Sequence, residues 1–386
     1  MKIMLVAGEA SGDLNGAHLA RALRDRQPAL ELFGMGGSKM AQAGVELLYD
    51  PTAISSVGFL EVLRSVNVLR RVLDRLAREL DRRQPACVVL IDFPEFNMRL
   101  GELAKARGIP VVYYFSPQAW AWRKGRAKSV AKHAALVCAV FPFEADVYRE
   151  AGARVEYVGH PLVDIVKPAL APQEARRALG VEQASPVIAL LPGSRRQELE
   201  NHLGVMFAAA KKLSAQFPQA RFLLPLAHTV ARGRVEAKLP PGVPIRIVEG
   251  MTYEALSVSD AAVAAVGTVT LEAALIGCPF VGVLRLSSST YWIAKRLYRE
   301  KYAVLPNIVV GREVVPELIQ EQVTPERIAQ EVMGLLDPRR RQQVREGFGE
   351  VRERLGGPGA VGRAAEAILR MVSEAPAAAQ GGSRGV

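Results

Sequence analysis

The sequence predicts an α/β protein with two Rossmann-like domains, each built on a doubly wound parallel sheet. Short apolar runs alternate with amphipathic stretches, which is the pattern of strands and crossover helices in parallel sheets. The alternation stops at a proline- and alanine-rich stretch, residues 168–185, and then starts again. A chain of 386 residues is long for one domain and comfortable for two.

Composition narrows the classes of function. Lys and Arg total 50 against 39 Asp and Glu, a net charge of +11, which favours an anionic partner such as nucleic acid, anionic lipid or a phosphorylated substrate. The three cysteines lie in apolar surroundings without paired spacing, as expected of reduced cytosolic residues. The five histidines show no ligand spacing, so we expect no metal site. We find no signal-peptide pattern, and no apolar run reaches the roughly 20 residues that span a bilayer.

The first domain begins with a strand at 2–7, the glycine loop GEASGDLNG and a helix. The glycine spacing is not the dinucleotide fingerprint, and no acidic residue ends the second strand at 32–37, so NAD binding is disfavoured. Glu9, Ser11 and Asp13 crowd the carboxyl end of the first strand, where ligands bind in such sheets. Ser11 and Asp13 equally fit caps of the following helix.

Residues 57–80 combine apolar positions with interleaved arginines. The segment fits a basic amphipathic helix on an anionic membrane surface, or a core helix with a solvated arginine face. By itself it favours the core helix. The residues that would form a membrane patch are Phe59, Leu60, Leu63, Val66, Val68, Leu69 and Leu73.

A strand at 87–91 delivers Asp92, and Glu95 and Asn97 follow in the same loop. A carboxylate at the carboxyl end of a parallel strand projects into the ligand crevice, where it can act as a general base. The competing interpretation is that Asp92 and Asn97 cap the next helix. Two acids and an amide in one loop favour the catalytic interpretation.

Three more strands complete the first domain, at 111–115, 136–141 and 155–158, and GHPLVD closes it. The stretch SPQAWAWRKGRAK, residues 116–128, carries two tryptophans among basic residues. Such a stretch suits base stacking or a membrane interface, and it also fits a plain lid over a binding site.

The second domain opens with a strand at 187–191, broken by Pro192 and Gly193. Ser194 and Gln197 have the spacing of a capping box, so a helix begins here with Arg195 in its first turn. The first N–H groups of a helix and a neighbouring arginine suit diphosphate oxygens. No Walker sequence follows, and the alternative is an ordinary strand-to-helix turn with solvated arginines.

A second glycine turn follows the strand predicted at 261–266. Gly267 and Thr268 start a helix that carries Glu272, which suggests a phosphate loop with a carboxylate for two ribose hydroxyls. A glutamate that only stabilises the helix dipole is the alternative. Farther on, LPNIVVGRE supplies Asn307. The other elements expected are strands at 222–225, 245–248 and 280–284, and helices at 291–302, 326–336 and 345–372.

Nine motifs in register resemble the bacterial lipid-A-disaccharide synthase family over roughly residues 2–335. They are GEASGD, SVGFLEVL, IDFPEFN, SPQAWAWR, FPFE, GHPLVD, LLPGSRRQE, GTVTLE and LPNIVVGRE. The resemblance implies a GT-B fold, two Rossmann-like domains facing a cleft, with neither metal nor cofactor. It implies an inverting hexosyltransferase of lipid A (lipopolysaccharide) biosynthesis. Such an enzyme joins UDP-2,3-diacylglucosamine to 2,3-diacylglucosamine 1-phosphate (lipid X), giving the β-1,6 disaccharide 1-phosphate and UDP.

The resemblance also implies residue roles. Asp92 matches the family's essential aspartate, and we expect it to deprotonate the acceptor; Arg195 matches the essential arginine. The UDP-sugar donor would then contact Gly193, Ser194, Arg195, Gly267, Thr268, Glu272 and Asn307. The acceptor side would contain Glu9, Ser11, Asp13, Glu95 and Asn97. For Glu9, Ser11, Asp13 and Asn307, we predict a location in the site but no particular role.

Partners and location follow from the same resemblance. Acyl substrates place the enzyme on the cytoplasmic leaflet of the inner membrane as a peripheral protein, and this shifts the 57–76 segment towards a docking patch. We expect no nucleic acid partner, and either a monomer or a homodimer. The domains expected are 1–164 and 165–336, then helices at 337–372, whose packing on the first domain stays open, and a disordered tail at 373–386.

Two other interpretations compete with this one. A UDP-sugar epimerase would share the two-domain fold and would need neither a lipid acceptor nor a membrane patch. A basic membrane-surface or RNA-binding protein would explain the charge, but it would leave Asp92 and the loop at Gly267 without a role. The fold by itself does not decide among them.

Overall fold

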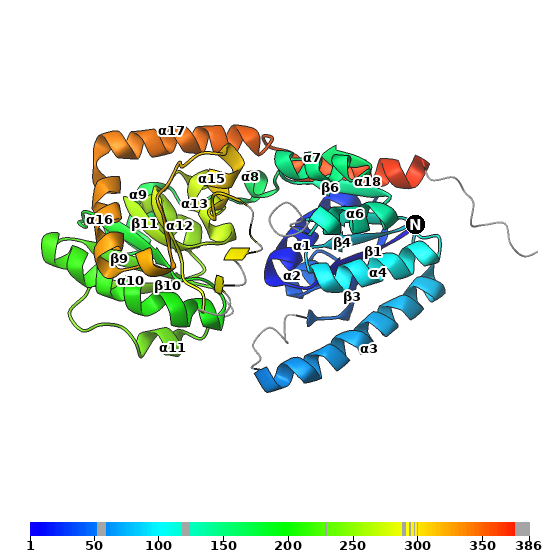
Figure 1. Cartoon of the computed structure of the whole chain (residues 1–386), viewed down its shortest axis with the longest axis horizontal. Coiled ribbons are helices and arrows are strands. Elements are labelled where there is room, and N and C mark those ends of the chain that lie inside the picture. The colour runs from blue at the N-terminus through cyan, green and yellow to red at the C-terminus, as the bar shows by residue number, and fades with distance from the viewer. Residues whose placement is uncertain are drawn as a thin grey trace, which may run out of the picture. The chain divides into compact units, whose positions relative to one another are not determined.

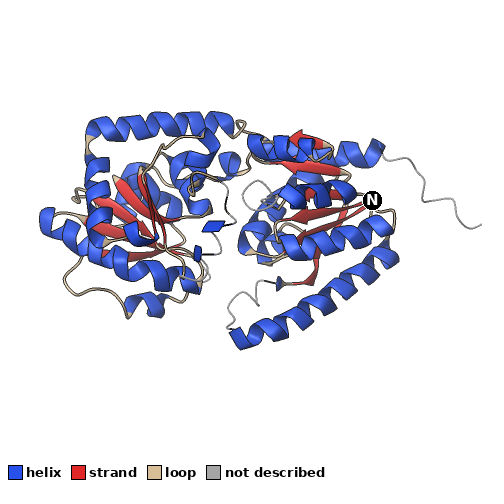
Figure 2. Ribbon diagram, viewed as in Figure 1, coloured by secondary structure: helices blue, strands red, loops and turns tan. Residues whose placement is uncertain are grey.

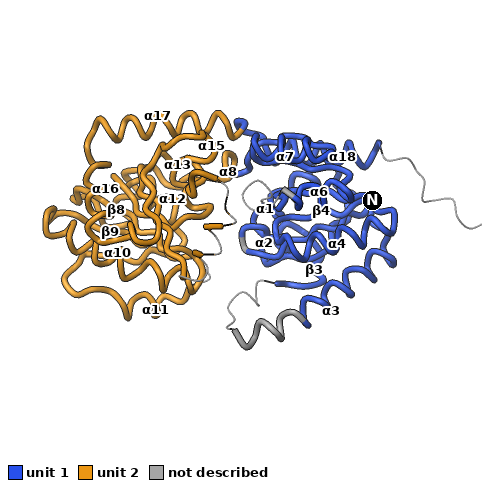
Figure 3. Tube along the Cα trace, in the orientation of Figure 1, with its two compact units in different colours: residues 1–161, 356–386 blue, residues 162–355 orange. Residues whose placement is uncertain are grey.

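A computed structural model describes residues 1–51, 59–117, 124–227, 230–287, 291–292, 295–296, 298 and 300–374, with the backbone alone at residues 10, 59–66 and 124. The chain forms two compact units, one of residues 1–161 with 356–386 and one of residues 162–355 (Figure 3). The chain passes from the first unit to the second after Pro161, close to the domain boundary expected at residue 164. Each unit is described by itself below.

The first unit contains a parallel sheet, with seven strands among the described residues, in the order β3-β2-β1-β4-β5-β6-β7. Apart from Lys2 at the start of β1, the inner strands β1, β4 and β5 are buried apolar runs, as expected when helices cover both faces. The strands are β1 (Lys2–Ala7), β2 (Glu31–Met35), β3 (Glu46–Tyr49), β4 (Cys87–Ile91), β5 (Val111–Tyr114), β6 (Leu136–Ala139) and β7 (Val155–Tyr157).

Helices cover both faces of this sheet (Figures 1 and 2). On one face α1, α2 and α18 pack together, and on the other α3, α4, α6 and α7 close a core that includes Phe33, Leu76, Leu100 and Tyr113. The helices are α1 (Ala10–Arg26), α2 (Ser38–Gln42), α3 (Phe59–Arg83), α4 (Pro94–Ala106), α6 (Lys124–His133), α7 (Pro142–Glu150) and α18 (Ala360–Glu374).

The second unit repeats the architecture with a parallel sheet, six-stranded among the described residues, in the order β10-β9-β8-β11-β12-β13. The predicted α/β class with two doubly wound parallel sheets is therefore confirmed. The strands are β8 (Val187–Leu191), β9 (Arg221–Leu226), β10 (Ile245–Glu249), β11 (Ala261–Ala265), β12 (Phe280–Leu284) and β13 (Glu317–Ile319).

In this unit α10 packs beside α16, while α12 packs against both α9 and α13. A small core of α9 and α12 against the sheet includes Leu179, Val187, Leu223 and Val258. The helices are α8 (Leu162–Ile165), α9 (Pro172–Ala178), α10 (Arg196–Gln216), α11 (Arg232–Glu236), α12 (Thr252–Val258), α13 (Thr268–Ile276), α15 (Leu305–Val310), α16 (Pro325–Leu336) and α17 (Pro338–Arg354), with the 3₁₀ helix η2 (Gln320–Gln322).

The C-terminal region differs from the single helical stretch expected at 345–372. It forms two helices, α17 in the second unit and α18 in the first, where α18 packs against α1. Between them, Gly356, Gly357 and Gly359 have positive φ angles of 87°, 65° and 90°, which favour glycine and end the helix. Arg363 holds this turn by donating hydrogen bonds to the carbonyls of Val158, Gly356, Gly357 and Pro358.

Several predictions differ from the structure or lie outside it. The edge strands β3 and β13 were not predicted, because they have only four and three residues and carry little alternation. The two tryptophans of the 116–128 stretch, residues 293, 294, 297 and 299 of the helix expected at 291–302, and the tail from residue 375 lie outside the described residues. Among the helices that the structure describes, none has the length and apolar character to cross a membrane.

The strand orders locate a candidate site in each unit. Strand order reverses between β1 and β4 in the first sheet, and between β8 and β11 in the second. In open α/β sheets, ligands bind beyond the carboxyl ends of the strands at such a reversal. Ser11 lies in the first turn of the helix after β1 and Asp92 directly follows β4, while Arg195 and Thr268 lie at the helix starts after β8 and β11.

Candidate functional site

Asp92 directly follows β4 at the strand-order reversal of the first unit, and its side chain is half-buried. One carboxylate oxygen accepts the N–H of Phe93 at 2.9 Å, and the other accepts the Ser11 hydroxyl at 3.5 Å. Because β1 and β4 are paired neighbours, the loops after these strands meet. The structure therefore brings together Asp92 and Ser11, two residues that the sequence analysis proposed from separate loops.

The side chain of Asn97 holds the end of β4 through hydrogen bonds. It is fully buried, and its amide group donates hydrogen bonds to the carbonyls of Asp92 at 2.5 Å and Ile91 at 3.3 Å. The helix that follows, α4, has Phe93 at its N-cap and no side-chain capping bond. The alternative in which Asp92 and Asn97 cap α4 is therefore wrong: Asn97 fixes the backbone that carries Asp92.

The backbone around Asp92 is strained. Asp92, Phe93 and Phe115 have φ angles of 53°, 52° and 59°, in the left-handed region that residues with a side chain seldom adopt. Gly8 leaves room for this arrangement, since a Cβ at that position would lie 2.2 Å from Cγ of Phe93. Non-glycine residues in this region are concentrated at functional sites, where the surrounding structure holds them in place.

The other acidic residues proposed for this side have different environments. Asp13 is buried, and its carboxylate accepts the N–H groups of Gly37, Lys39 and Met40, so it caps α2 rather than its own helix α1. Glu95 is exposed and forms an ion pair with Arg126. Glu9 is half-buried at the N-cap of α1. We keep Glu9 beside Ser11 as a candidate and assign Asp13 a structural role.

The apolar patch expected on α3 is only partly described. The side chains of Phe59, Leu60, Leu63 and Val66 lie outside the described residues. Val68, Leu69 and Leu73 are partly buried against the core, so they are less available to a membrane than we expected. The solvent face of the described part of α3 instead carries exposed arginines, among them Arg70, Arg71, Arg75 and Arg78.

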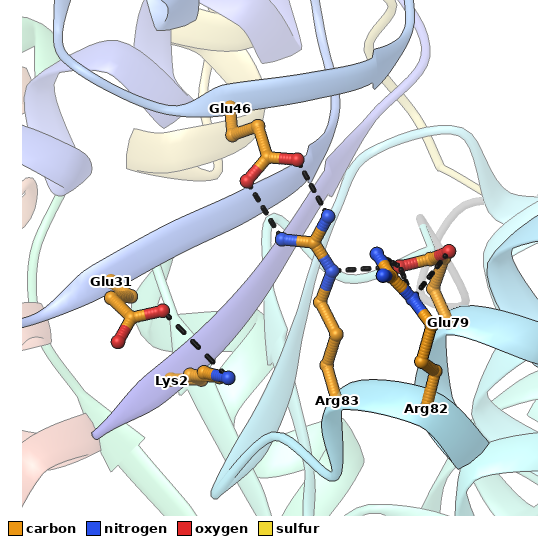
Figure 4. Close-up of polar contacts among 6 residues, drawn as sticks. All are labelled: Lys2, Glu31, Glu46, Glu79, Arg82 and Arg83. Atoms are coloured by element: carbon orange, nitrogen blue, oxygen red, sulfur yellow. Dashed lines mark hydrogen bonds and ion pairs between the residues drawn. The ribbon is translucent and has the colours of Figure 1, made fainter.

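The C-terminal end of α3 is anchored to the sheet through Arg83 (Figure 4). Its guanidinium donates two hydrogen bonds to Glu46 on β3, at 2.6 and 2.7 Å, and one to Glu79 at 2.7 Å. It also lies 4.6 Å from the centre of the Phe33 ring. The bonds from Arg83 hold the pKa of Glu46 below its usual value. This anchor fixes the helix axis relative to the edge strand.

In the second unit, the turn after β8 forms the predicted strand-to-helix turn, but its cap differs. The helix α10 begins at Arg196, and the carboxylate of Glu198 accepts the N–H groups of Ser194 at 2.8 Å and Arg195 at 3.2 Å. The capping box that we expected from Ser194 and Gln197 is therefore wrong by one position. An acidic side chain of the protein itself occupies the place where we expected a diphosphate.

Gly193 makes this arrangement possible. Its φ angle is 111°, and a Cβ there would lie 2.3 Å from a carboxylate oxygen of Glu198. The Arg195 side chain is 68% exposed, with one nitrogen 4.0 Å from Glu198. Glu198 therefore takes the N–H groups of the two residues before α10, and the exposed guanidinium of Arg195 is the charged group that this turn offers a ligand.

The turn after β11 differs in that no acidic side chain lies at the start of its helix. The helix α13 begins at Thr268 after Gly267, with neither a side-chain capping bond nor an acidic residue in its first turn. Because β8 and β11 are paired neighbours, Arg195 and this helix start follow adjacent strands. The helix dipole and the first N–H groups of α13 therefore remain available to an anion.

Glu272 lies one turn along α13 and receives a hydrogen bond from the Tyr253 hydroxyl at 3.3 Å. Burial raises the pKa of this carboxyl above its usual value, and the Tyr253 bond partly opposes the shift. A contact between Glu272 and the ribose of a nucleotide stays a prediction.

Asn307 is fully buried in α15 and binds the protein itself. Its amide donates to the carbonyl of Val315 and to Glu317, and its oxygen accepts the N–H groups of Val314 and Val315. All its hydrogen-bonding groups are thus engaged with the segment that leads into β13. We assign Asn307 a structural role, and a direct contact with the donor stays a prediction.

The sequence analysis missed two residues that shape the site in the second unit. Glu198 was overlooked because Gln197 also fits a capping pattern. His202 is buried in α10; it accepts the N–H of Arg285 at 3.1 Å and donates to the carbonyl of Pro192 at 3.1 Å, which ties the turn after β8 to the end of β12. A histidine in the middle of a helix carries no local signal for such a contact.

These features define a class of protein: a two-domain α/β enzyme with the GT-B fold. Solved structures support the fold. UDP-GlcNAc 2-epimerase from Neisseria meningitidis, bound to UDP-GlcNAc, has a TM-score of 0.68 at 13% identity and covers 96% of this chain and 100% of its own. The calicheamicin glycosyltransferase has a TM-score of 0.60 at 17% identity and covers 96% and 98%.

Sequence comparison narrows the class to one family. The family model described as lipid-A-disaccharide synthetase matches residues 3–366. The lipid-A-disaccharide synthase of Myxococcus xanthus is 43% identical over 373 residues, 96% of this chain and 97% of that protein. That of Geobacter sulfurreducens is 40% identical over 375 residues, 97% and 98%. The chain belongs to the lipid-A-disaccharide synthase family, which makes it a glycosyltransferase.

Proposed function

We propose that the protein transfers 2,3-diacylglucosamine from UDP to the 6-hydroxyl of 2,3-diacylglucosamine 1-phosphate (lipid X), forming the β-1,6 disaccharide 1-phosphate and UDP. The observation that carries this proposal is the carboxylate of Asp92, held at the strand-order reversal by a strained backbone and by Asn97. Family membership over almost the whole chain supports the same reaction.

Asp92 is the proposed general base. The reaction inverts the anomeric centre, so a single displacement with one base suffices. As Asp92 takes the proton of the 6-hydroxyl, the oxygen forms a bond to C1 of the donor, and the C1–O bond to UDP breaks with both electrons leaving on the diphosphate. Ser11 and Glu9, near Asp92 on the loop after β1, are candidates to orient the acceptor.

Arg195 and the start of α13 are the proposed diphosphate site. Negative charge develops on the leaving UDP, and the exposed guanidinium of Arg195 and the first N–H groups of α13 offer positive charge there. Glu272 would accept the ribose hydroxyls of the same nucleotide. We therefore expect the protein itself to supply the charge that stabilises the diphosphate.

The arginine face of α3 is the proposed membrane contact. Arg70, Arg71, Arg75 and Arg78 are exposed on a helix anchored by Arg83, and guanidinium groups are attracted to lipid phosphates. The apolar residues at the start of α3 would add to this contact. Binding to vesicles with anionic lipid that weakens with added salt supports the assignment, and salt-independent binding contradicts it.

The central experiment measures UDP release by purified protein in detergent and EDTA, from UDP-2,3-diacylglucosamine with and without lipid X. Release that requires lipid X and continues in EDTA supports both the disaccharide synthesis and the stabilisation of the diphosphate by the protein itself. Release without lipid X indicates a hydrolase or epimerase-like reaction, which the shared fold alone does not separate from glycosyl transfer. Bound UDP without any release would contradict the acceptor assignment.

The role of Asp92 has its own test. Asp92→Asn should remove nearly all turnover, because the amide cannot accept the proton, and it should leave the UDP dissociation constant unchanged. Ser11→Ala is the matched variant, since it removes only the 3.5 Å contact to Asp92, and it should have a much smaller effect. Loss of UDP binding in Asp92→Asn would contradict the assignment.

A further inference from the structure

Two motifs that the proposed function leaves without a role, SPQ at 116–118 and FPFE at 141–144, meet in the first unit through Ser116 and Glu144. The Ser116 hydroxyl donates to Oε1 of Glu144 at 2.7 Å, and Oε2 of Glu144 accepts the N–H of Val140 at 3.1 Å. The two residues are 7% and 2% exposed. This buried pair joins the end of β5 to the start of α7.

The pair is connected to Asp92 through one residue. The N–H of Asp92 donates to the carbonyl of Phe115 at 3.0 Å, and Ser116 follows Phe115 in the chain. On the other side, the Tyr148 hydroxyl donates to the carbonyl of Pro117 at 2.7 Å. Two side chains of α7, Glu144 and Tyr148, therefore hold the two residues that follow Phe115.

Phe115 needs this support because its φ angle of 59° is unfavourable for a residue with a side chain. Its ring contacts Tyr114 and the buried His160, with ring centres 5.0 and 5.6 Å apart. Without an anchor at Ser116, the peptide after Phe115 would relax towards an extended conformation. The carbonyl that accepts the Asp92 N–H would then turn away.

A role in capping α7 does not by itself explain why Glu144 is buried. A capping glutamate at this position needs only the N–H groups of Val140 and Phe141, and it can lie at the surface. Glu144 is instead buried, and burial raises its pKa to about 7. The bond to Ser116 is the contact that this burial adds, and it reaches across to the loop beside Asp92.

We propose that Ser116 and Glu144 are positioning residues for the base: by fixing Phe115 in the left-handed conformation, they hold the Asp92 backbone and so aim its carboxylate at the acceptor. This inference rests on the proposed role of Asp92. It concerns the orientation of the base and leaves nucleotide binding, a property of the second unit, untouched.

The test compares Ser116→Ala with Ser129→Ala, a control at a half-buried serine of α6 in the same unit. We expect Ser116→Ala to lower kcat about tenfold, since small misplacements of a catalytic group reduce rates strongly. The UDP dissociation constant and the donor KM should change less than twofold. Amide hydrogen exchange at Asp92 should become about tenfold faster, while that of Leu90 stays unchanged. Ser129→Ala should match the wild type.

Glu144→Ala is the second variant, because it removes the acceptors of both the Ser116 hydroxyl and the Val140 N–H. It should reproduce both effects at least as strongly. A Ser116→Ala protein with kcat within twofold of the wild type, or with unchanged exchange at Asp92, overturns the inference. Wild-type protein that forms no disaccharide overturns the proposed function as well, so the two failures are distinguishable.

Discussion

The starts of α10 and α13 follow neighbouring strands of one sheet after similar glycine turns, yet they present different chemistry to an anion. At α10 the carboxylate of Glu198 binds the N–H groups of Ser194 and Arg195. At α13 no acidic residue lies in the first turn and no side chain caps the helix. One glutamate three residues into a helix thus decides whether its dipole is neutralised internally or left for a ligand.

The two turns therefore contribute different chemical groups to the proposed diphosphate site. The turn after β8 contributes an exposed, charged side chain, Arg195, on a backbone that Glu198 and His202 hold in place. The turn after β11 contributes backbone N–H groups at a fixed position. A glycine turn by itself therefore does not identify a phosphate loop; the residue at the third helical position has to be considered as well.

The largest effect is expected for Arg195→Ala. If the α10 turn acts through its guanidinium, the variant should lose about 100- to 1,000-fold in kcat, as when one donor to a developing charge is removed. Arg196→Ala is the matched control, because Arg196 is equally exposed and pairs with Glu200 at 2.8 Å. Steady-state UDP release measures both. Equal losses in the two variants would contradict a specific role for Arg195.

Glu272→Gln tests the α13 side of the comparison. Loss of a charged acceptor for the ribose hydroxyls should weaken UDP binding about 10- to 100-fold, the range for hydrogen bonds to charged groups. Calorimetric titration with UDP and with 2′-deoxy-UDP measures the effect, and the deoxy ligand should no longer be discriminated by the variant. Unchanged UDP affinity would remove Glu272 from the ribose site.

Glu198→Ala should convert the α10 start into one that resembles α13. Losing the cap should cost about 1 kcal/mol of unfolding free energy, measured by urea denaturation. The amides of Ser194 and Arg195 should then shift in NMR spectra on addition of inorganic phosphate, whereas in the wild type the shifts should be confined to Thr268 and Val269. Phosphate shifts at Ser194 in the wild type would show that Glu198 does not exclude anions.

The smallest expected effect is the dependence of UDP affinity on pH. Burial raises the pKa of Glu272, so its charged form is lost at a higher pH than usual as the solution is acidified. UDP affinity should therefore fall several-fold as pH is lowered from 8 towards that pKa, by the linkage between protonation and binding. The Glu272→Gln variant shares the titration of UDP itself and serves as the reference. Parallel pH profiles for the two proteins would contradict ionised Glu272 as the ribose acceptor.

The raised pKa of Glu272 changes folding stability with pH in the opposite direction from UDP affinity. A carboxyl with a raised pKa in the folded state binds more protons there than in the unfolded chain. Its contribution is fully present below the unfolded pKa of 4.5 and is lost as pH rises through the folded value. Acidification from neutral pH thus stabilises the fold at Glu272 while it weakens the proposed nucleotide contact, a trade-off common at functional sites.

Parts of the site could be predicted because they depend on strand ends alone. Asp92 and the turns at Gly193 and Gly267 each follow an apolar run that becomes a buried strand, so their place at the carboxyl edge was predictable. Asp13 shows the limit. Its position in the first turn of α1 suggested a cap for that helix or a ligand contact. The structure gives it three N–H partners from residues 37–40, which are distant in the sequence.

The sequence by itself determined the α/β class, two doubly wound sheets and the family, because hydrophobic periodicity and ordered motifs are properties of neighbouring residues. Only the tertiary structure decided which polar groups are already satisfied. Asp13 on α1 binds the start of α2, His202 on α10 binds the N–H of Arg285, and Glu144 binds Ser116 from another element. Hydrogen-bond partners are set by the folded packing of distant segments, so no local pattern reveals which residues keep their capacity for a ligand.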